Sequence, residues 1–125
     1  MAQGDNSQKP LKEGKYFWHY TDAEGAKGIM NSGSIRPSTD STYDATYGKG
    51  HYFTDKGPSN KSKELLANNY DSQDRPKGSV QYGIGIKKNQ LPNIEKCPAG
   101  ERDVYLNEDD EDLKLPKGSV LVKRF

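Results

Sequence analysis

The sequence predicts a small α+β domain with two early helices and a largely antiparallel, bent sheet. Strand-like segments outnumber helical ones, both helical segments come early, and strands and helices do not alternate regularly. Leu, Ile, Val and Phe number only 20 of 125 residues, a fraction at which disorder becomes a concern. The formal net charge is only +1, however, and eight tyrosines and a tryptophan add buried area, so we expect a folded domain.

One domain is expected. Residues 1–14 are polar, lack hydrophobic periodicity and contain Pro10, so we expect a disordered leader there and a single domain over residues 15–125. The single cysteine, Cys97, can form neither an internal disulfide nor a cysteine-based metal site. No apolar run approaches the length of a membrane span or of a signal-peptide core, so we expect a cytoplasmic location or export by a route that this segment does not encode.

An aromatic strand over residues 16–20 is expected first, and the alternation of its side chains places His19 on the face opposite Trp18. The spacing of Thr21–Glu24 is typical of a capping box, in which the threonine hydroxyl begins a helix. A stripe of small and apolar residues at helical spacing follows, and Gly33 stands where a C-terminal cap belongs. The sequence therefore predicts a short helix that ends at Gly33.

The stretch from Tyr47 to Asp55, YGKGHYFTD, combines two glycines with a short strand. Gly48 and Gly50 permit a tight turn and a close approach of another group to the backbone. The residues that follow are rich in aromatic and β-branched side chains, as strands are. Alternation places Tyr52 and His51 on opposite faces, and we interpret His51 as a packed histidine.

The rest of the chain is expected to supply a second helix and three more strands. Pro58 at a first helical position predicts a helix over residues 59–70. A strand over residues 80–86 would carry Gly83 and Gly85 on one face, so another group should approach that face closely. Further strands are expected over residues 103–106 and 119–125, with a loop over residues 89–100 and an acidic loop over residues 107–112.

Three polar residues stand out by their context, namely His19 in the aromatic strand, Tyr52 behind the glycines and Asp103 at the start of a strand. Taken singly, each residue type at such a position is ordinarily a packing or surface residue. Alternation in the strand over residues 103–106 places Val104 and Leu106 in the core and turns Asp103 and Tyr105 toward a cleft on the opposite face. Glu101 lies on the same face and is the alternative carboxylate.

The order and flanks of these residues resemble the ADP-ribosyltransferase superfamily. The segment GKGHYFTDKGPSNKSKELLANNY, residues 48–70, is similar to the tyrosine motif of its poly(ADP-ribose) polymerase and diphtheria-toxin branch. WHYTD, residues 18–22, is similar to the strand that supplies the histidine of that branch. Still more similar is a bacterial and fungal toxin-type clade named for its His-Tyr-Asp signature, in which HYT, a small-residue helix, an I-x-P step and YGxGxYFTD follow one another. The resemblance covers residues 16 to about 106.

This resemblance implies an ADP-ribosyltransferase-like fold, which is a small, bent, mostly antiparallel two-sheet structure with two short helices flanking the cleft. It also implies that the protein takes NAD as its substrate and uses no metal. It implies that Tyr52 stacks against the flat, positively charged nicotinamide ring, with Tyr70 closing the other side. His19 would bind the adenosine ribose, backbone groups of Tyr20 would hold the nicotinamide carboxamide, and Asp103 would stabilise the oxocarbenium-like transition state. The residues expected to bind NAD are His19, Tyr20, Thr21, Gly48, Gly50, Tyr52, Phe53 and Tyr70.

The function that follows from the resemblance is mono-ADP-ribosyl transfer to a protein or nucleic acid. Aspartate at position 103 is shorter than the glutamate of the polymerase branch, so strong polymerase activity is not expected. If water is the acceptor, the protein is a NAD glycohydrolase, and a non-catalytic module that binds NAD, ADP-ribose or a partner protein is a further alternative. Removal of an RNA 2′-phosphate would favour clustered arginines, and the four here are scattered along the sequence. The resemblance further implies a monomer, delivery as an effector or toxin domain, and an immunity protein as a candidate partner.

Overall fold

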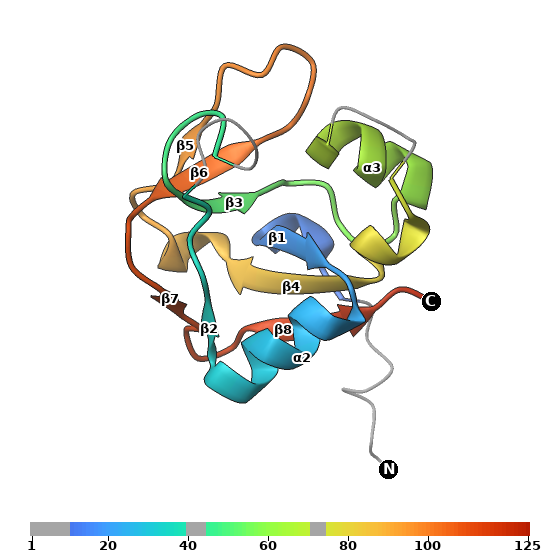
Figure 1. Cartoon of the computed structure of the whole chain (residues 1–125), viewed down its shortest axis with the longest axis horizontal. Coiled ribbons are helices and arrows are strands. Elements are labelled where there is room, and N and C mark those ends of the chain that lie inside the picture. The colour runs from blue at the N-terminus through green and yellow to red at the C-terminus, as the bar shows by residue number, and fades with distance from the viewer. Residues whose placement is uncertain (1–10, 40–44, 71–74) are drawn as a thin grey trace.

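The computed structural model describes residues 11–39, 45–70 and 75–125. These ranges contain eight strands, two α-helices and three 3-10 helices, so the predicted α+β class is confirmed (Figure 1). In chain order they are η1 (Glu13–Lys15), β1 (Tyr16–Thr21), α2 (Ala23–Ser32), β2 (Ser34–Ile35), β3 (Gly50–Phe53), α3 (Ser62–Tyr70), η2 (Lys77–Val80), β4 (Tyr82–Lys87), η3 (Lys88–Gln90), β5 (Glu95–Lys96), β6 (Tyr105–Glu108), β7 (Leu113–Lys114) and β8 (Val120–Lys123). No helix in the described ranges is long and apolar enough to cross a membrane.

Two three-stranded antiparallel sheets form the body of the domain. One has the strand order β1-β4-β8 and the other β3-β6-β5, and a short ribbon of β2 and β7 is added to them. The sheets meet where Trp18 in β1 pairs with Thr54, just after β3. There the Trp18 N–H donates to Thr54 O at 2.8 Å, and the Thr54 N–H donates to Trp18 O at 2.9 Å. This single bridge fixes the position of β1, which carries His19, against β3, which carries Tyr52.

The two α-helices cover opposite faces of the β1-β4-β8 sheet. Alternation along β1 places Phe17 in one core cluster with Ile29 of α2, and Trp18 in another with Leu65 of α3. Figure 1 shows α2 and α3 on opposite sides of β4. The alternation predicted for the aromatic strand is therefore confirmed.

The bare face of β4 is filled by aromatic rings of β1, as the glycine spacing predicts. A Cβ atom added to Gly83 would lie 2.9 Å from Tyr20 Cε1, and one added to Gly85 would lie 2.8 Å from Trp18 Cζ3. Both distances are shorter than carbon atoms tolerate, so only glycine lets these rings lie flat on the strand.

The first helix begins one residue later than the capping-box prediction. The N-cap is Asp22, whose Oδ1 accepts a hydrogen bond from the Gly25 N–H at 2.7 Å. Thr21 is instead the last residue of β1, where it pairs with Tyr82. An aspartate caps a helix as well as a threonine does, so the pairing of β1 decides between the two. Gly33 ends the helix with φ 74°, as predicted.

The segment between β3 and α3, residues 57–62, is held by residues from both ends of the described chain. The predicted helix over residues 59–70 begins only at Ser62, so Pro58 does not occupy a first helical position. Glu13 Oε1 accepts a hydrogen bond from Ser59 Oγ at 2.8 Å. Arg124 donates to Pro58 O, to Asn60 O and to Ser62 Oγ.

Most of the predicted leader, residues 1–10, lies outside the described residues. Glu13 and Gly14, at the end of the range expected to be leader, belong to η1. This turn is tied to β1, because Trp18 Nε1 donates to Glu13 O at 3.1 Å.

Two of the predicted strands are displaced along the sequence. The strand expected over residues 80–86 begins at Tyr82, and Val80 belongs to η2. The strand expected over residues 103–106 is β6, which begins at Tyr105 and ends at Glu108.

Candidate active site

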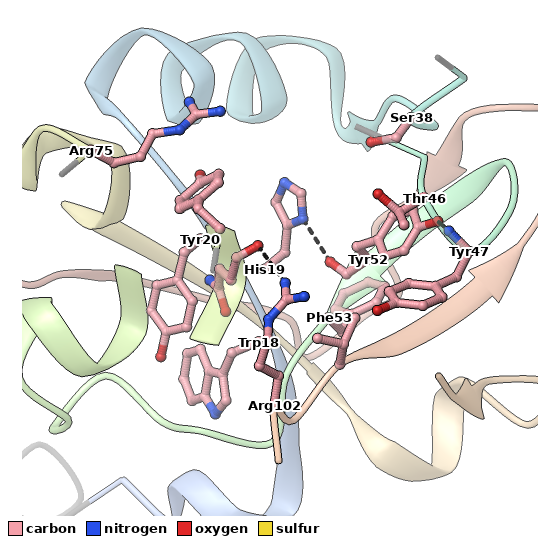
Figure 2. Close-up of a pocket in the computed structure, with 13 residues that line it drawn as sticks. Trp18, His19, Tyr20, Ser38, Thr46, Tyr47, Tyr52, Phe53, Arg75 and Arg102 are labelled. Carbon is pink, nitrogen blue, oxygen red and sulfur yellow. Dashed lines mark hydrogen bonds between the residues drawn. The ribbon is translucent and has the colours of Figure 1, made fainter. Parts of the chain in front are cut away.

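A cavity of about 670 Å³ lies between β1, β3 and the C-terminal end of α3 (Figure 2). Its volume is within the range of small-molecule and cofactor sites. Its lining residues are Trp18, His19, Tyr20, Ser38, Thr46, Tyr47, Tyr52, Phe53, Asn69, Tyr70, Arg75, Arg102 and Val104. Five of the residues expected to bind NAD are among them, namely His19, Tyr20, Tyr52, Phe53 and Tyr70, whereas Thr21, Gly48 and Gly50 are not.

His19 and Tyr52 are joined by a hydrogen bond at the wall of the cavity. His19 Nδ1 lies 3.0 Å from Tyr52 O. A carbonyl oxygen only accepts, so Nδ1 carries the hydrogen and Nε2 of the neutral ring has a lone pair. Burial lowers the pKa of His19, and the nearby His51 acts in the same direction, while the bond to the Tyr52 carbonyl partly opposes them. The neutral imidazole therefore offers Nε2 as a hydrogen-bond acceptor, the partner that a ribose hydroxyl requires.

The hydroxyl of Tyr52 is held by the turn before β3. It donates to Gly48 O at 2.5 Å and accepts from the Tyr47 N–H at 2.9 Å. Because β3 fixes one end of the side chain and this turn fixes the other, the ring is held in one orientation at the cavity wall. A ring held in this way loses little entropy when a ligand stacks against it.

Gly48 and Gly50 make room for β6, and neither of them lines the cavity. Gly50 has φ 154°, and a Cβ atom there would lie 2.3 Å from Asn107 O. Gly48 has φ 128°, and its Cβ would lie 3.3 Å from Leu106 Cδ2. The close approach that the glycines permit is thus made by the neighbouring strand of the same sheet.

Tyr20 presents its side chain to the core and its backbone to the open edge of β1. Its hydroxyl donates to Lys56 O at 2.7 Å, and burial raises the pKa of Tyr20, which keeps the hydroxyl protonated. In a strand, the N–H and C=O of residues two apart point the same way. Because Trp18 directs these groups away from β4 to Thr54, Tyr20 also directs its groups away from β4, beyond the end of the pairing with β3.

The carboxylate of Asp103 is held beside the cavity by hydrogen bonds. Its Oδ2 accepts hydrogen bonds from Thr54 Oγ1 at 2.8 Å and from the Asp55 N–H at 2.5 Å. Asp103 itself is not a lining residue, although both of its neighbours, Arg102 and Val104, are. The third residue of the predicted constellation therefore lies next to the cavity, bonded to the residue that joins the two sheets.

The alternation predicted around Asp103 is confirmed for Val104 and wrong for Tyr105. Val104 is buried in a core cluster with Leu106, and it also borders the cavity. Tyr105, expected at the cleft, does not line the cavity and packs against Phe17 with ring centroids 4.8 Å apart. Glu101, the alternative carboxylate, is exposed in the preceding turn and does not line the cavity.

Asn68 of α3 holds the segment around Asp103 in place, and sequence reasoning missed it. The Asp103 N–H donates to Asn68 Oδ1 at 2.6 Å, and Asn68 Nδ2 donates to Asp103 O at 2.9 Å and to Thr54 Oγ1 at 3.1 Å. The buried side-chain amide of Asn68 thus satisfies both the N–H and the C=O of Asp103, as the backbone of a neighbouring strand would. The available signal was a polar residue one helical turn from Leu65, on the apolar face of the predicted helix.

Two arginines that sequence reasoning did not assign to the site line the cavity. Arg75 lies over the ring of Tyr70, with Cζ 4.3 Å from the centroid. Arg102 donates from Nε to Asn68 O at 2.8 Å and from Nη2 to Asn69 O at 3.3 Å. Among the described lining residues none is acidic. Nor do the described ranges contain a group of three or more His, Cys, Asp or Glu side chains placed to hold a metal ion.

Comparisons with known proteins place the chain in a family. A comparison with curated proteins and one with solved structures each find no match. The sequence model of the family Tox-ART-HYD1, described as an HYD1 signature containing ADP-ribosyltransferase, matches residues 17–115. This span contains His19, Tyr52 and Asp103 and every residue that lines the cavity. ADP-ribosyltransferases use NAD as their substrate. The match confirms the resemblance seen in the sequence, and the chain belongs to the family of ADP-ribosyltransferases with the HYD1 signature.

Proposed function

We propose that this protein transfers a single ADP-ribose unit from NAD to a macromolecular acceptor. The observation that carries the proposal is the bonded pair of His19 and Tyr52 at the wall of a cavity of cofactor size, in a member of an ADP-ribosyltransferase family. A neutral imidazole acceptor and a fixed tyrosine ring are the two groups that a ribose and a nicotinamide ring need.

The nicotinamide end of NAD stacks on Tyr52 in this proposal. The ring is flat and carries a positive charge, so the face of a tyrosine attracts it by about 0.5 to 2 kcal/mol. The backbone N–H and C=O of Tyr20 point to the open edge of β1 and pair with the carboxamide as a strand would. Nε2 of His19 accepts a hydrogen bond from the adenosine ribose.

The reaction breaks the bond between the nicotinamide nitrogen and the anomeric carbon of its ribose. The bonding electrons go to the nicotinamide ring and neutralise it, which leaves an oxocarbenium-like positive charge on the ribose. We propose that Asp103 stabilises this charge, because its Oδ1 takes no part in the bonds that Thr54 and Asp55 make to Oδ2. A nucleophile of the acceptor then attacks the anomeric carbon and releases its proton.

The test is release of nicotinamide from NAD with and without cell lysate, together with a mass-spectrometric search for ADP-ribose adducts. Release that requires lysate, with adducts on a macromolecule, supports transfer. Release without lysate and without adducts would make the protein a NAD glycohydrolase. Absence of release in both conditions would contradict both enzymes and leave a binding module.

Matched variants locate the chemistry in this cavity. Tyr52→Ala and His19→Ala should each abolish release, whereas Tyr52→Phe should keep most of it, because stacking needs the ring and the hydroxyl serves the turn. Asp103→Asn should lower release by about a hundredfold, a typical loss for one electrostatic contact in a transition state. Glu101→Gln, on an exposed carboxylate two residues away, is its control and should change nothing.

A further inference from the structure

Arg75 and Arg102 give the cavity a charge that the whole chain does not have. They are the two charged side chains among its described lining residues, in a protein whose formal net charge is only +1. Figure 2 shows Arg75 on the side of Tyr20 and Arg102 in the middle of the view, with Tyr47 and Tyr52 on the opposite side. In this view Arg75 therefore lies across the cavity from Tyr52, and Arg102 lies between them.

Arg102 is fixed with part of its guanidinium group still available. Nε and Nη2 donate to two carbonyl oxygens in the last turn of α3, Asn68 O and Asn69 O. These bonds occupy one edge of the planar guanidinium group. The N–H groups at its end, on Nη1 and the second hydrogen of Nη2, remain available to a ligand. Two parallel N–H groups at the end of a fixed guanidinium match two oxygens of a phosphate group.

Arg75 is held by stacking, which leaves its hydrogen-bond donors uninvolved. Its Cζ lies 4.3 Å from the centroid of the Tyr70 ring, and this contact uses the face of the guanidinium. The donors lie in the plane of the group, around its rim. Arg75 can therefore keep its place on Tyr70 while it binds an anion edge-on.

We propose that Arg75 and Arg102 bind the diphosphate of NAD, an inference that rests on the proposed function. NAD carries its negative charge on the diphosphate and its positive charge on the nicotinamide ring, and the position of Arg75 across the cavity from Tyr52 matches this separation. In NAD the diphosphate is joined through one methylene group to each ribose. An anion site in the same cavity as His19 and Tyr52 is thus within reach of the diphosphate whenever the riboses are bound.

A phosphate group on the acceptor is the other source of the same chemistry. The NAD diphosphate is favoured because the arginines line the wall of the cavity that also contains the histidine and the tyrosine, and NAD must enter that cavity first. The two sources predict different effects of the same substitutions, on the binding of NAD fragments in one case and on acceptor transfer alone in the other.

The experiment compares the binding of ADP and of adenosine to the intact protein by isothermal titration calorimetry, at low and at high salt. ADP should bind at least about tenfold more tightly than adenosine, and high salt should reduce the difference. Arg75→Gln should weaken ADP binding about tenfold and leave adenosine unchanged. Arg36→Gln, at an exposed arginine that does not line the cavity, is the matched control and should bind ADP as the wild type does.

Arg102 needs a second variant, because it also holds the end of α3. Arg102→Lys keeps the positive charge but loses the fork, so it should weaken ADP more than adenosine while the thermal unfolding midpoint stays close to that of the wild type. Equal binding of ADP and adenosine, or ADP binding that neither Arg75→Gln nor Arg102→Lys changes, would overturn the proposal. If both variants bind ADP normally but lose transfer to lysate, the site serves an acceptor phosphate and the proposal is also wrong.

The proposed function can fail separately. ADP binding that depends on both arginines, without nicotinamide release from NAD, would contradict the enzyme and support the diphosphate site. Nicotinamide release that neither arginine variant changes would support the enzyme and contradict the diphosphate site.

Discussion

The tautomer of His19 depends on a contact between two strands that lie far apart in the sequence. The ring is in β1, and the carbonyl oxygen that orients it belongs to Tyr52 in β3, so the Trp18–Thr54 bridge sets the distance between them. Burial lowers the pKa of His19 below its ordinary value of 6.5. At neutral pH the ring is therefore uncharged, with Nε2 ready to accept.

Nicotinamide release should therefore be independent of pH above 6.5 and fall only at more acid pH. Protonation of Nε2 removes the lone pair that accepts from the ribose, and a lowered pKa moves this event to the acid side of 6.5. The free energy of unfolding should fall over the same acid range. The unfolded chain binds the proton at a higher pH than the folded chain does, so lowering the pH favours the unfolded state. The pKa can be read by NMR, because the chain has only two histidines and His19→Ala identifies the signal. An inflection above 6.5 would contradict this assignment.

At the residue scale, the sequence predicted that His19 and Tyr52 lie at one cavity, but it did not predict which residues surround Asp103. The first two lie within well-marked strands, where alternation decides which way a side chain points. Asp103 precedes β6, and its orientation depends on Thr54 and Asn68, which no local pattern connects to it. Arg75 and Arg102 likewise become neighbours of one cavity only through the position of α3.

At the scale of single elements, the periodicity of the sequence predicted the faces of the strands correctly, whereas the predicted starts of the helices were wrong. The glycine face of β4 and the aromatic alternation of β1 follow from a period of two and were correct. The predicted starts of α2 and α3 were wrong, because several residues near each start could cap a helix. For α2, Thr21 pairs with β4, so the helix is capped by Asp22. The short strands β2, β5 and β7 have two residues each, too few for any periodicity.

The close contact of β3 with β6 gives a prediction for Gly50. Gly50→Ala would force a side chain into a backbone conformation of φ 154° and place its Cβ 2.3 Å from Asn107 O, so it should lower the free energy of unfolding by about 3 kcal/mol or more. Gly28→Ala is the control, since a Cβ atom added there in α2 would meet none of the described residues within 4 Å beyond its own helix. It should raise stability by about 0.5 to 1 kcal/mol. Denaturant titration measures both, and equal effects would show that β6 does not lie where described.

At the scale of the whole molecule, Arg124 connects the last strand to two distant parts of the chain. It donates to Pro58 O and Asn60 O in the segment over residues 57–62, and to Val80 O in η2 at 2.7 Å. Burial lowers the pKa of Arg124, and the neighbouring Tyr20 partly offsets this. No sequence pattern indicates such a role for a residue next to the end of the chain.

Arg124→Ala should lower the free energy of unfolding by about 2 kcal/mol or more, because several carbonyl groups lose a charged donor at once. Arg124→Lys should recover only part of the loss, since an ammonium group cannot reproduce the planar fork. Trp18 is the only tryptophan and is fully buried, so its fluorescence reports global unfolding without a label. An unchanged unfolding midpoint for Arg124→Ala would contradict the structural role given to this residue.

The register of the β1-β4-β8 sheet has a mechanical consequence. Tyr16, at the start of β1, pairs with Lys87 at one end of β4, whereas Lys123, at the end of β8, pairs with Tyr82 at the other end. A force that separates the two ends of the chain therefore pulls β1 and β8 in opposite directions along β4. The ladder hydrogen bonds lie across the strands, so they share this load in shear and must break together, not one after another. We expect the domain to resist stretching from its two ends far more strongly than stretching from its N-terminal end and the loop after β4, because those two points lie at the same end of the β1-β4 pair and the force opens its hydrogen bonds one after another. Single-molecule force spectroscopy would measure this difference.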